Sequence, residues 1–436
     1  MKMFNPQVET MARSEIQALQ LNRLQKTVER CYHNSRFYRE KMDALGVKPE
    51  DIQTLDDLRR LPFTNKTDLR DNYPFGLFSA PMEEIVRVHA SSGTTGKPTT
   101  VGYTKNDIDA WAECTARALG CAGGRKNDVV QISYGYGLFT GGLGLHYGAE
   151  RLGATALPTS SGNTQRQIML MQDFGTSILA CTPSYALMLG ETMRDMGIDT
   201  NELRLRAGTF GAEPWTEGMR RQIEDLMGID ALDIYGLSET MGPGVAIECK
   251  EEKHGLHIWE DQFLVEILDP ETCEPVPDGE VGELVITTIN KEGMPTLRYR
   301  THDLTSIIPE PCSCGRTHRK IERLKGRTDD MLIVRGVNVF PSQVETVLTK
   351  VKGVMPHYLI VVDRVHNSDT MEVQVELHPD AVSDTVKNIE GIRATLSKEL
   401  QSYLGISAKV RLLPPKELER SEGKAKRVID KRKFDN

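Results

Sequence analysis

The sequence of 436 residues contains no apolar run close to the ~20 residues that a membrane-spanning helix needs. Its first ten residues hold no apolar core of the kind found in secretory signal peptides. An excess of basic residues is also missing, since the net charge is -8, and this argues against a nucleic-acid-binding surface. We therefore expect a cytoplasmic protein with no nucleic acid and no membrane among its partners.

Internal repeats and low-complexity segments are absent as well. The composition is that of an ordinary globular protein, with 39% hydrophobic and 27% charged residues. At about 150 residues per domain, the length predicts two or three domains. The eight cysteines are mostly scattered singly, which in a reducing compartment indicates free thiols or metal ligands rather than disulfides.

Residues 91–99 form a stretch rich in glycine and hydroxyl side chains that follows the strand-like run 85–89. Small side chains let backbone N–H groups approach an anion closely, and Lys97 adds a positive charge, so the stretch predicts a polyphosphate cradle. It is not a Walker A loop, because the chain has Ser91 and Pro98 where that motif needs Gly and Ser or Thr. A flexible surface loop is the alternative for this composition taken alone.

Strand and helix patterns alternate through the first two thirds of the chain. Strands are expected at 128–134, 154–157, 177–181, 205–210 and 231–235, and helices at 16–45, 105–119, 164–174 and 183–196. This rhythm is typical of α/β proteins with a covered, largely parallel sheet, whose ligands bind outside the carboxyl ends of the strands. The loops 91–99, 211–214 and 235–240 should therefore lie on one rim.

The pattern changes to mainly β from residue 264, with strands expected at 264–268, 282–288, 298–304 and 305–308. From residue 329 it changes again, to a compact α+β pattern. We therefore predict an α/β fold. Its large N-terminal domain, 1–328, has covered mixed or parallel sheets and a β-rich subdomain at about 264–325, and its small α+β C-terminal domain covers 329–436.

Aromatic residues on a glycine-rich backbone occur at 134–142. Tyr136 and Phe139 could line a flat apolar slot for a planar ligand, because glycines leave room beside the rings. The start of a helix packed tightly on a strand is equally compatible with this stretch, and both side chains would then face the core.

Five separated motifs, taken together, resemble one superfamily. Residues 91–99, 235–240, 299–304, 326–341 and the final Gly423-Lys424 occur in the order seen in adenylate-forming (acyl-activating) enzymes. Within that superfamily the chain resembles phenylacetate–coenzyme A ligases, a likeness that includes 335–341 and 420–427. The resemblance implies an AMP-forming ligase that converts phenylacetate, ATP and coenzyme A into phenylacetyl-CoA, AMP and diphosphate through an acyl-adenylate. It also implies Mg²⁺ and a homodimer.

The resemblance further implies roles for single residues of the nucleotide site. The β- and γ-phosphates would be held by Ser92, Gly93, Thr94, Thr95, Gly96 and Lys97, and the adenine and its edge by Gly211, Ala212, Glu213, Pro214, Tyr235, Gly236 and Asp233. Ser238, which replaces the superfamily's common threonine but keeps the hydroxyl, would bond the α-phosphate, and Glu239 would bind Mg²⁺. Asp303 would accept the ribose hydroxyls and Arg327 would contact the ribose or a phosphate, although Asp303 could also be an ordinary turn residue.

In the last part of the chain, the resemblance implies that Lys424 contacts the carboxylate and the α-phosphate during adenylation. A lysine of a solvated basic tail is the alternative. The C-terminal domain would be mobile about a hinge at Asp329, and Val334, Arg335 and Gly336 would line the channel for the pantetheine arm of coenzyme A.

Cys249, His257, Cys312 and Cys314 make up a set of three thiols and one imidazole, which suits tetrahedral zinc. The Cys-x-Cys spacing is tighter than the usual C-x₂-C, and four unlinked buried side chains are the alternative. Some members of the resembling family carry such a constellation and others lack it, which implies a structural role. We expect His254, which follows a charged run, to face water instead.

Three alternatives to phenylacetate ligation remain. The chain could activate another aryl acid such as indoleacetate or benzoate, since one methylene in an apolar pocket is worth only about 1–3 kcal/mol. It could load the thiol of a carrier protein instead of coenzyme A. A non-catalytic nucleotide sensor on the same fold is disfavoured by the presence of Glu239, Asp303 and Lys424.

Overall fold

The computed structural model describes residues 3–91, 98–328, 332–335, 337–365, 368–382, 386–420 and 426–432. The chain divides into two compact units. The first contains residues 1–181, 198–212 and 228–323, and the second contains 182–197, 213–227 and 324–436. The domain boundary placed at 328/329 from the sequence stays a prediction.

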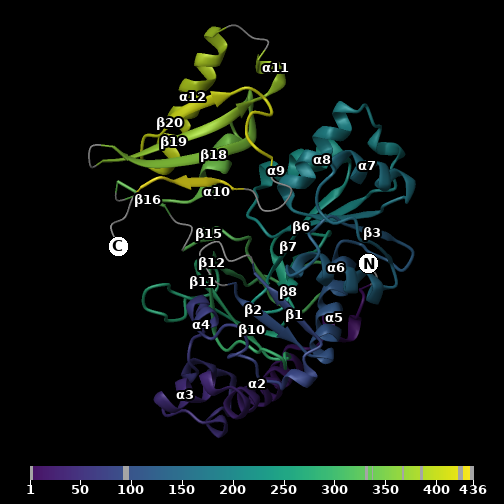
Figure 1. The fold of residues 1–436 in the computed structure, drawn as a ribbon, viewed down its shortest axis with the longest axis vertical. Coiled ribbons are helices and arrows are strands. Elements are labelled where there is room, and N and C mark those ends of the chain that lie inside the picture. Colours follow the sequence, from purple (N-terminus) through teal and green to yellow (C-terminus); the bar gives the residue numbers. More distant parts are fainter. Residues whose placement is uncertain are drawn as a thin grey trace. The chain divides into compact units, whose positions relative to one another are not determined.

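Helices of the first unit surround its sheets (Figure 1). They are α1 (Pro6–Glu9), α2 (Arg13–Asn34), α3 (Arg36–Ala44), α4 (Lys66–Asp71), α5 (Lys105–Cys121), α6 (Thr140–Leu152) and α7 (Thr164–Asp173), with 3-10 turns at Pro49–Asp51, Leu55–Arg60, Met82–Glu84 and Thr200–Glu202. The helix expected at 16–45 is broken, because Ser35 adopts extended backbone angles between α2 and α3. No helix among the described residues is both long and apolar enough to cross a membrane.

A nine-stranded sheet forms the centre of the first unit. Its strand order is β13-β14-β9-β8-β7-β6-β5-β3-β4. The strands are β3 (Val129–Ile132), β4 (Thr155–Leu157), β5 (Ile178–Cys181), β6 (Ala207–Gly211), β7 (Asp230–Leu237), β8 (Gly242–Glu248), β9 (Leu256–Ile258), β13 (Ile307–Ile308) and β14 (Lys320–Ile321). From β4 to β7 the neighbours pair in parallel, and from β7 to β13 they pair antiparallel.

Burial explains which sequence patterns form this sheet. Every residue of β5 and β6 is buried, as expected for strands of a parallel sheet covered on both faces. On the antiparallel side, α5 and α6 pack against each other and against β8 (Figure 1). Helix α5 begins at a capping box, in which the Asp107 N–H donates to Thr104 Oγ1 and the Thr104 N–H donates to Asp107 Oδ2.

Two smaller β elements complete the first unit. Strands β10 (Phe263–Leu268), β11 (Gly282–Thr288) and β12 (Tyr299–Thr305) pair antiparallel in chain order, as the β-rich pattern predicted. Strands β1 (Arg87–Ala90) and β2 (Thr100–Tyr103) pair antiparallel on either side of the 91–99 loop, with Ala90 opposite Thr100. The base of the expected phosphate loop is thus a β-ladder.

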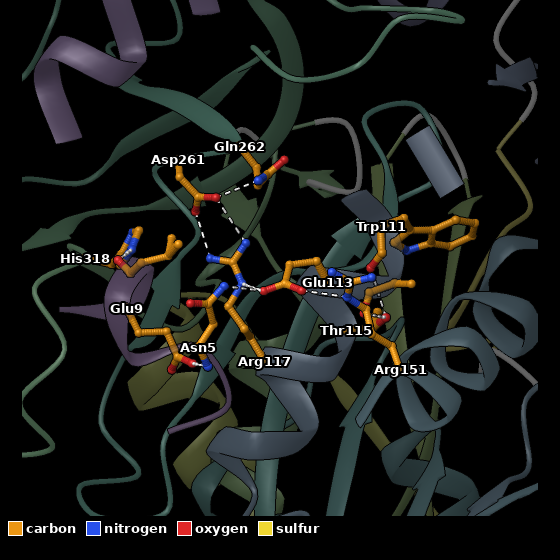
Figure 2. A network of polar contacts seen from close by, with 12 residues as sticks. Asn5, Glu9, Trp111, Glu113, Thr115, Arg117, Arg151, Asp261, Gln262 and His318 are labelled. Carbon is orange, nitrogen blue, oxygen red and sulfur yellow. Dashed lines mark hydrogen bonds and ion pairs between the residues drawn. The ribbon is translucent and has the colours of Figure 1, made fainter. Parts of the chain in front are cut away.

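A buried network of charged groups fixes the N-terminal segment to the first unit (Figure 2). Glu9 is fully buried, and its carboxylate accepts from Arg316 Nε at 2.7 Å and from the Asn5 N–H at 2.7 Å. Arg117 on α5 is also fully buried and donates to both oxygens of Asp261, at 2.8 and 3.1 Å. These pairs join α1, α5 and the segments that flank β14 and precede β10.

The second unit has its own apolar core. Its elements are α8 (Pro183–Asp195), α9 (Glu217–Met227), α10 (Pro341–Leu348), α11 (Pro379–Val382), α12 (Val386–Leu404), β15 (Gly326–Arg327), β16 (Leu332–Val334), β17 (Val337–Val339), β18 (Val354–Val365), β19 (Ser368–Leu377), β20 (Lys409–Leu413) and β21 (Val428–Asp430). The sheet order is β20-β19-β18-β21, and β16 pairs with β17. Helices α10 and α12 pack on each other, and α10 packs on β18.

Candidate active site

One hydroxyl group ties together the carboxyl ends of three neighbouring parallel strands. Tyr134 follows β3, and its OH donates to the Cys181 carbonyl at the end of β5 at 2.5 Å. The N–H of Gly211, the last residue of β6, donates to the same hydroxyl oxygen at 3.1 Å. Carboxyl ends of adjacent parallel strands form the ligand-binding edge of an open α/β sheet. Tyr134 therefore fixes the spacing of this rim.

Glycines bring the ends of β6 and β7 close to their neighbours. A Cβ added at Gly211 would lie 2.0 Å from the Ile234 carbonyl oxygen, and one at Gly236 would lie 2.0 Å from the Gly242 carbonyl oxygen. Ala212 continues from β6 in the left-handed region, with φ of 69°. Of the expected adenine segment, these residues belong to the first unit. Glu213 and Pro214 belong to the second, where the Glu213 carboxylate accepts from the Ser184 N–H at 2.8 Å.

The turn between β7 and β8 carries the two residues expected at the phosphates. Ser238 is buried, and its Oγ lies 2.8 Å from Thr140 Oγ1 at the start of α6. Glu239 is buried too, with Oε1 3.5 Å from Thr99 Oγ1 beside β2. A carboxylate among hydroxyl groups is a set of hard oxygen donors, which is what Mg²⁺ prefers.

Asp303 and Tyr235 contact each other directly. The Tyr235 OH donates to Asp303 Oδ2 at 2.6 Å, a short charge-assisted hydrogen bond. Asp303 lies within β12 and is buried, so the ordinary-turn alternative is wrong for this residue. The phenol fixes the orientation of a carboxylate whose two oxygens suit paired hydroxyl groups.

Asp233 on β7 is held by two partners from other segments. Its N–H donates to Glu248 Oε2 on β8 at 2.7 Å, and its Oδ2 accepts from Arg323 Nε at 3.1 Å. An ionic partner was not expected from the sequence, because Arg323 lies in a stretch without a recognisable motif. The arginine fixes the direction of the Asp233 carboxylate.

Residues 20–290, more than half of the chain, match the AMP-binding enzyme family, and residues 336–432 match the AMP-binding enzyme C-terminal domain. The chain belongs to the AMP-binding enzyme family.

The chain is also similar to individual CoA ligases. It is 51% identical to a phenylacetate-coenzyme A ligase of Thermus thermophilus, over 99% of the chain and 100% of that relative. A crystal structure of 2-hydroxyisobutyryl-CoA ligase in the postadenylation state with R3-HIB-AMP superposes with a TM-score of 0.92. The sequence in that structure is 30% identical, and the alignment covers 98% of the present chain and 91% of the ligase chain.

A second structure of the same ligase, with 2-HIB-AMP and CoA in the thioesterification state, superposes with a TM-score of 0.73. It is 31% identical and aligns over 98% of the chain and 92% of its own length. The predicted fold class, a mixed α/β N-terminal part with a separate C-terminal domain, is confirmed by these similarities to AMP-binding enzymes.

The aromatic pair expected in the aryl pocket packs on α6 of this AMP-binding enzyme. A Cβ added at Gly142 would lie 2.9 Å from the Tyr136 ring, and one at Gly141 would lie 2.6 Å from the Phe139 ring. The Tyr136 OH lies 3.3 Å from His146 Nδ1, and burial raises the pKa of Tyr136 above its usual value. Phe139 remains 41% exposed. The two glycines leave space that the rings themselves occupy, and the pocket role of both residues stays a prediction.

The three cysteines and the histidine chosen as metal ligands lie together in the first unit. Their ligand atoms all lie within 4.8 Å of one another. Cys249 Sγ is 3.5 Å from Cys312 Sγ, and Cys314 Sγ is 3.4 Å from His257 Nε2. His257 Nδ1 lies 3.2 Å from the His318 carbonyl oxygen, which leaves Nε2 to point at the thiols. The four side chains are therefore clustered, and their binding of zinc stays a prediction. The side chain of His254 is exposed as expected.

Several expected residues of the AMP-binding site lie outside the described residues. They are Ser92, Gly93, Thr94, Thr95, Gly96, Lys97, Asp329, Gly336 and Lys424. Their neighbours in the second unit are described: Val334 is fully buried in the core, and the exposed Arg335 donates to Ser407 O at 2.5 Å and to its Oγ at 3.3 Å. Arg327 forms β15.

The site residues expected from the sequence did not include Tyr134, Thr140 and Arg323, which contact residues of the site. Thr140 stands in the glycine-rich stretch at the first residue of α6, so its place at a helix start was a usable signal. Tyr134 is the last residue of the strand predicted at 128–134, which could have placed it on the rim. Arg323 offered no signal.

Proposed function

We propose that the protein is an ATP-dependent aryl-acid–coenzyme A ligase that converts phenylacetate into phenylacetyl-CoA, with release of AMP and diphosphate. The observation that carries the proposal is the 51% identity to a phenylacetate-coenzyme A ligase over that relative's whole length. The described rim supports it, because Ser238, Glu239, Tyr235 and Asp303 stand on β7, its turn and β12 in the first unit.

In the first half-reaction, a carboxylate oxygen of the acid bonds to the α-phosphorus, and the bond from that phosphorus to diphosphate breaks. We infer that Asp303, oriented by Tyr235, accepts the ribose hydroxyls, and that Ser238 donates to the α-phosphate. Glu239 and the neighbouring hydroxyls are oxygen donors that fit Mg²⁺, which when bound offsets phosphate charge. Lys97 and Lys424 are proposed to add positive charge at the same step.

In the second half-reaction, the sulfur of coenzyme A bonds to the acyl carbon and AMP leaves. We propose that Arg335 and Gly336 contact the pantetheine arm and that Asp329 is the hinge for the change between steps. Val334, expected beside them, has its side chain buried in the core and would support this segment instead. These assignments rest on the resemblance of the motif 335–341 to the ligase family.

We also propose that Cys249, His257, Cys312 and Cys314 bind one structural zinc ion. The donor set, three sulfurs and one imidazole nitrogen within 4.8 Å, matches a closed tetrahedral site with no position left for substrate. The contact of His257 Nδ1 with a backbone carbonyl is the usual outer partner that selects Nε2 as the ligand atom.

The function is tested with a panel of aryl acids. Acid-dependent exchange between ATP and labelled diphosphate reports adenylation, and AMP release with coenzyme A present reports the complete reaction. We expect phenylacetate to give the highest kcat/KM in both assays. Exchange without thioester formation would favour loading of a carrier protein, and absence of acid-dependent exchange with every acid would contradict the ligase assignment.

A further inference from the structure

A buried lysine lies beneath the turn that carries Ser238 and Glu239. Lys291 stands between β11 and β12 and is only 2% exposed. Its Nζ donates to the carbonyl oxygen of Thr240, the residue directly after Glu239, at 2.8 Å. A fully buried lysine is rare, because removing an ammonium group from water is costly unless specific partners stabilise it. The partners of Lys291 must therefore offset the cost of burying its charge.

The segment that carries Lys291 is anchored to the start of α5. Asp107 is fully buried, and its carboxylate accepts the N–H groups of Glu292 at 2.6 Å, Gly293 at 2.8 Å and Thr104 at 2.9 Å. Two of these three donors directly follow Lys291 in the chain. Asp107 therefore holds the backbone next to Lys291 in place independently of any contact of the lysine side chain.

Three side chains from different elements hold three of the four carbonyls of the segment 240–243. Besides the bond from Lys291 to Thr240, the Tyr103 OH donates to the Met241 carbonyl at 2.8 Å, and Trp111 Nε1 donates to the Pro243 carbonyl at 3.0 Å. The Tyr103 and Trp111 rings stack with centroids 5.1 Å apart, and Lys291 Nζ lies 4.6 Å from the Tyr103 centroid. Of these three donors, Lys291 alone is charged.

Two carboxylates, Asp107 and Glu239, favour the charged form of Lys291. Burial lowers the pKa of Lys291 to about 8, while Asp107 and Glu239 oppose that shift. The side chain therefore keeps its proton at neutral pH.

We propose that Lys291 is a positioning residue for adenylation: it fixes the turn through the Thr240 carbonyl and so holds Glu239 in place to take up Mg²⁺. This inference rests on the proposed function, because it assumes that Glu239 binds the metal that accompanies ATP. It assigns Lys291 no contact with substrate.

The test replaces the lysine and then returns its functional group. Lys291→Ala leaves a space that matches propylammonium, and buried cavities of this kind bind small molecules of matching shape. We expect the variant to lose about 100-fold in kcat of ATP–diphosphate exchange, the loss typical of a preorganised electrostatic group. KM for the aryl acid should stay within about threefold of the wild-type value, because the acid does not touch Lys291.

Propylamine at neutral pH should raise the kcat of Lys291→Ala at least about tenfold. The same concentration of 1-propanol, which has the same size and can donate a hydrogen bond, should not. Equal restoration by both compounds, or by neither, overturns the proposal. Tyr103→Phe is the matched control, because it removes a neutral donor from the same segment. It should cost less than about fivefold in kcat. If Tyr103→Phe lowers kcat as much as Lys291→Ala does, the positive charge of Lys291 is not needed to position the turn.

Two further measurements keep the outcome clear. If Lys291→Ala does not fold, Lys291→Met keeps the volume without the charge, and a kcat above a third of the wild-type value in that variant overturns the proposal. Calorimetry of ATP binding with and without Mg²⁺ needs no acid and no turnover. We expect Mg²⁺ to tighten ATP binding by the wild type and to have less effect on the variant. A wild type that binds Mg²⁺–ATP yet activates no aryl acid contradicts the proposed function alone.

Discussion

Single positions on the rim of the nine-stranded sheet decide how closely β6 and β7 approach each other. Gly211 lacks the space for even a methyl group, since its Cβ would lie 2.0 Å from the Ile234 carbonyl oxygen. The same residue donates its N–H to Tyr134, so a shift of the backbone here also disturbs the link between three strand ends. Stability and ligand geometry therefore depend on the same atom positions.

Gly211→Ala should lower the free energy of unfolding by about 1–3 kcal/mol, the usual cost of overpacking. It should also weaken ATP binding, because the displaced strand end carries Ala212. Urea denaturation and ATP titration measure the two effects. Gly391→Ala is the control: Gly391 lies within α12 with no atom within 4 Å of an added Cβ. That change should stabilise by about 0.5–1 kcal/mol, as alanine favours helix. Equal stability of wild type and Gly211→Ala would contradict the packing argument.

Asp303 allows the nucleotide role to be separated from the structural one. In Asp303→Asn the amide oxygen can still accept from the Tyr235 OH, so the fold should change little in stability. A ribose hydroxyl would lose a charged acceptor, worth about 1.5–3 kcal/mol. We expect kcat/KM for ATP to fall about 10- to 100-fold, and KM for the aryl acid to stay near the wild-type value.

Asp269→Asn provides the comparison for Asp303→Asn. Asp269 follows β10, and its exposed carboxylate accepts the Thr272 N–H at 2.8 Å in a turn. Kinetics with varied ATP should not distinguish this control from the wild type. An unchanged kcat/KM for ATP in Asp303→Asn would remove Asp303 from the nucleotide site.

Helix α5 is anchored by a buried charge, Arg117. Arg117 bonds both oxygens of Asp261 and lies 3.7 Å from Glu113, which also pairs with Arg151 at 2.6 Å (Figure 2). Burial alone would raise the pKa of Asp261, but the Arg117 guanidinium outweighs it and lowers the pKa from 3.8 to about 2. The ionised pair is thus preferred in the folded chain.

Asp261→Asn should cost about 3–5 kcal/mol of unfolding free energy at neutral pH, because it leaves Arg117 buried without its partner. The folded pKa of Asp261 lies below its unfolded value of 3.8, so its contribution is present above pH 3.8 and is lost as the pH falls toward 2. The difference between wild type and variant should therefore shrink over that window. Urea denaturation at a series of pH values measures it.

Asp109→Asn is the matched control for that pair, since Asp109 bonds Lys105 on the exposed face of the same helix. Asp109→Asn should change the free energy of unfolding by less than about 1 kcal/mol. A pH-independent difference for Asp261→Asn would show that the loss comes from packing and not from ionisation.

The proposed zinc site joins short elements that have little apolar core of their own, since β9 and β14 contain three and two residues. We expect about one zinc per chain in tag-free protein, and a strong chelator should lower Tm because metal binding to such a site contributes to folding. Cys312→Ser should lower Tm more than it lowers the rate per folded molecule. Cys273→Ser, outside the cluster, should change neither, and metal analysis that finds no zinc ends this proposal.

Elements with a clear period could be predicted from the sequence, and elements that depend on distant partners could not. Strand β5 is buried at every residue and α5 begins at a Thr-x-x-Asp cap, so both follow from local pattern. Strand β8 begins with Gly-Pro-Gly, which locally indicates a turn, and its strand form comes from pairing with β7. The break at Ser35 was missed because the apolar period runs on through α2 and α3.

The same distinction holds in the candidate site. Strand ends at Gly211 and Ser238 were predictable, since ligands of such sheets bind at carboxyl ends. The contacts that orient them were not. Thr140 meets Ser238 across 98 residues, and Arg323 meets Asp233 across 90. No local pattern encodes such pairs, because folding of the intervening chain brings them together.

For the whole molecule, the proposed reaction sets a requirement that no single residue meets. In the proposed mechanism, adenylation places Lys424 near the acid carboxylate, and thioester formation places the thiol of coenzyme A near the same carbon. One fixed arrangement cannot place both groups at one carbon atom, so we expect the C-terminal domain to turn about Asp329 between the steps. Both residues lie outside the described part of the chain, and the expectation comes from the motifs around them.

Two variants should therefore fail at opposite steps. Lys424→Ala should lose ATP–diphosphate exchange yet still form thioester from supplied phenylacetyl-adenylate and coenzyme A, because its charge matters where phosphate charge develops. Asp329→Pro fixes φ at about −65° and restricts rotation at that residue. It should keep the exchange reaction and lose most of the transfer to coenzyme A.

Measured together, the two half-reactions distinguish the roles without reference to overall turnover, which both variants should reduce. Each variant thereby serves as the folding control for the other, since each keeps the activity that its counterpart loses. If Lys424→Ala loses both half-reactions equally, the lysine is misassigned. Wild-type turnover in Asp329→Pro would rule out rotation at Asp329, because a fixed φ there would then cost the second step nothing.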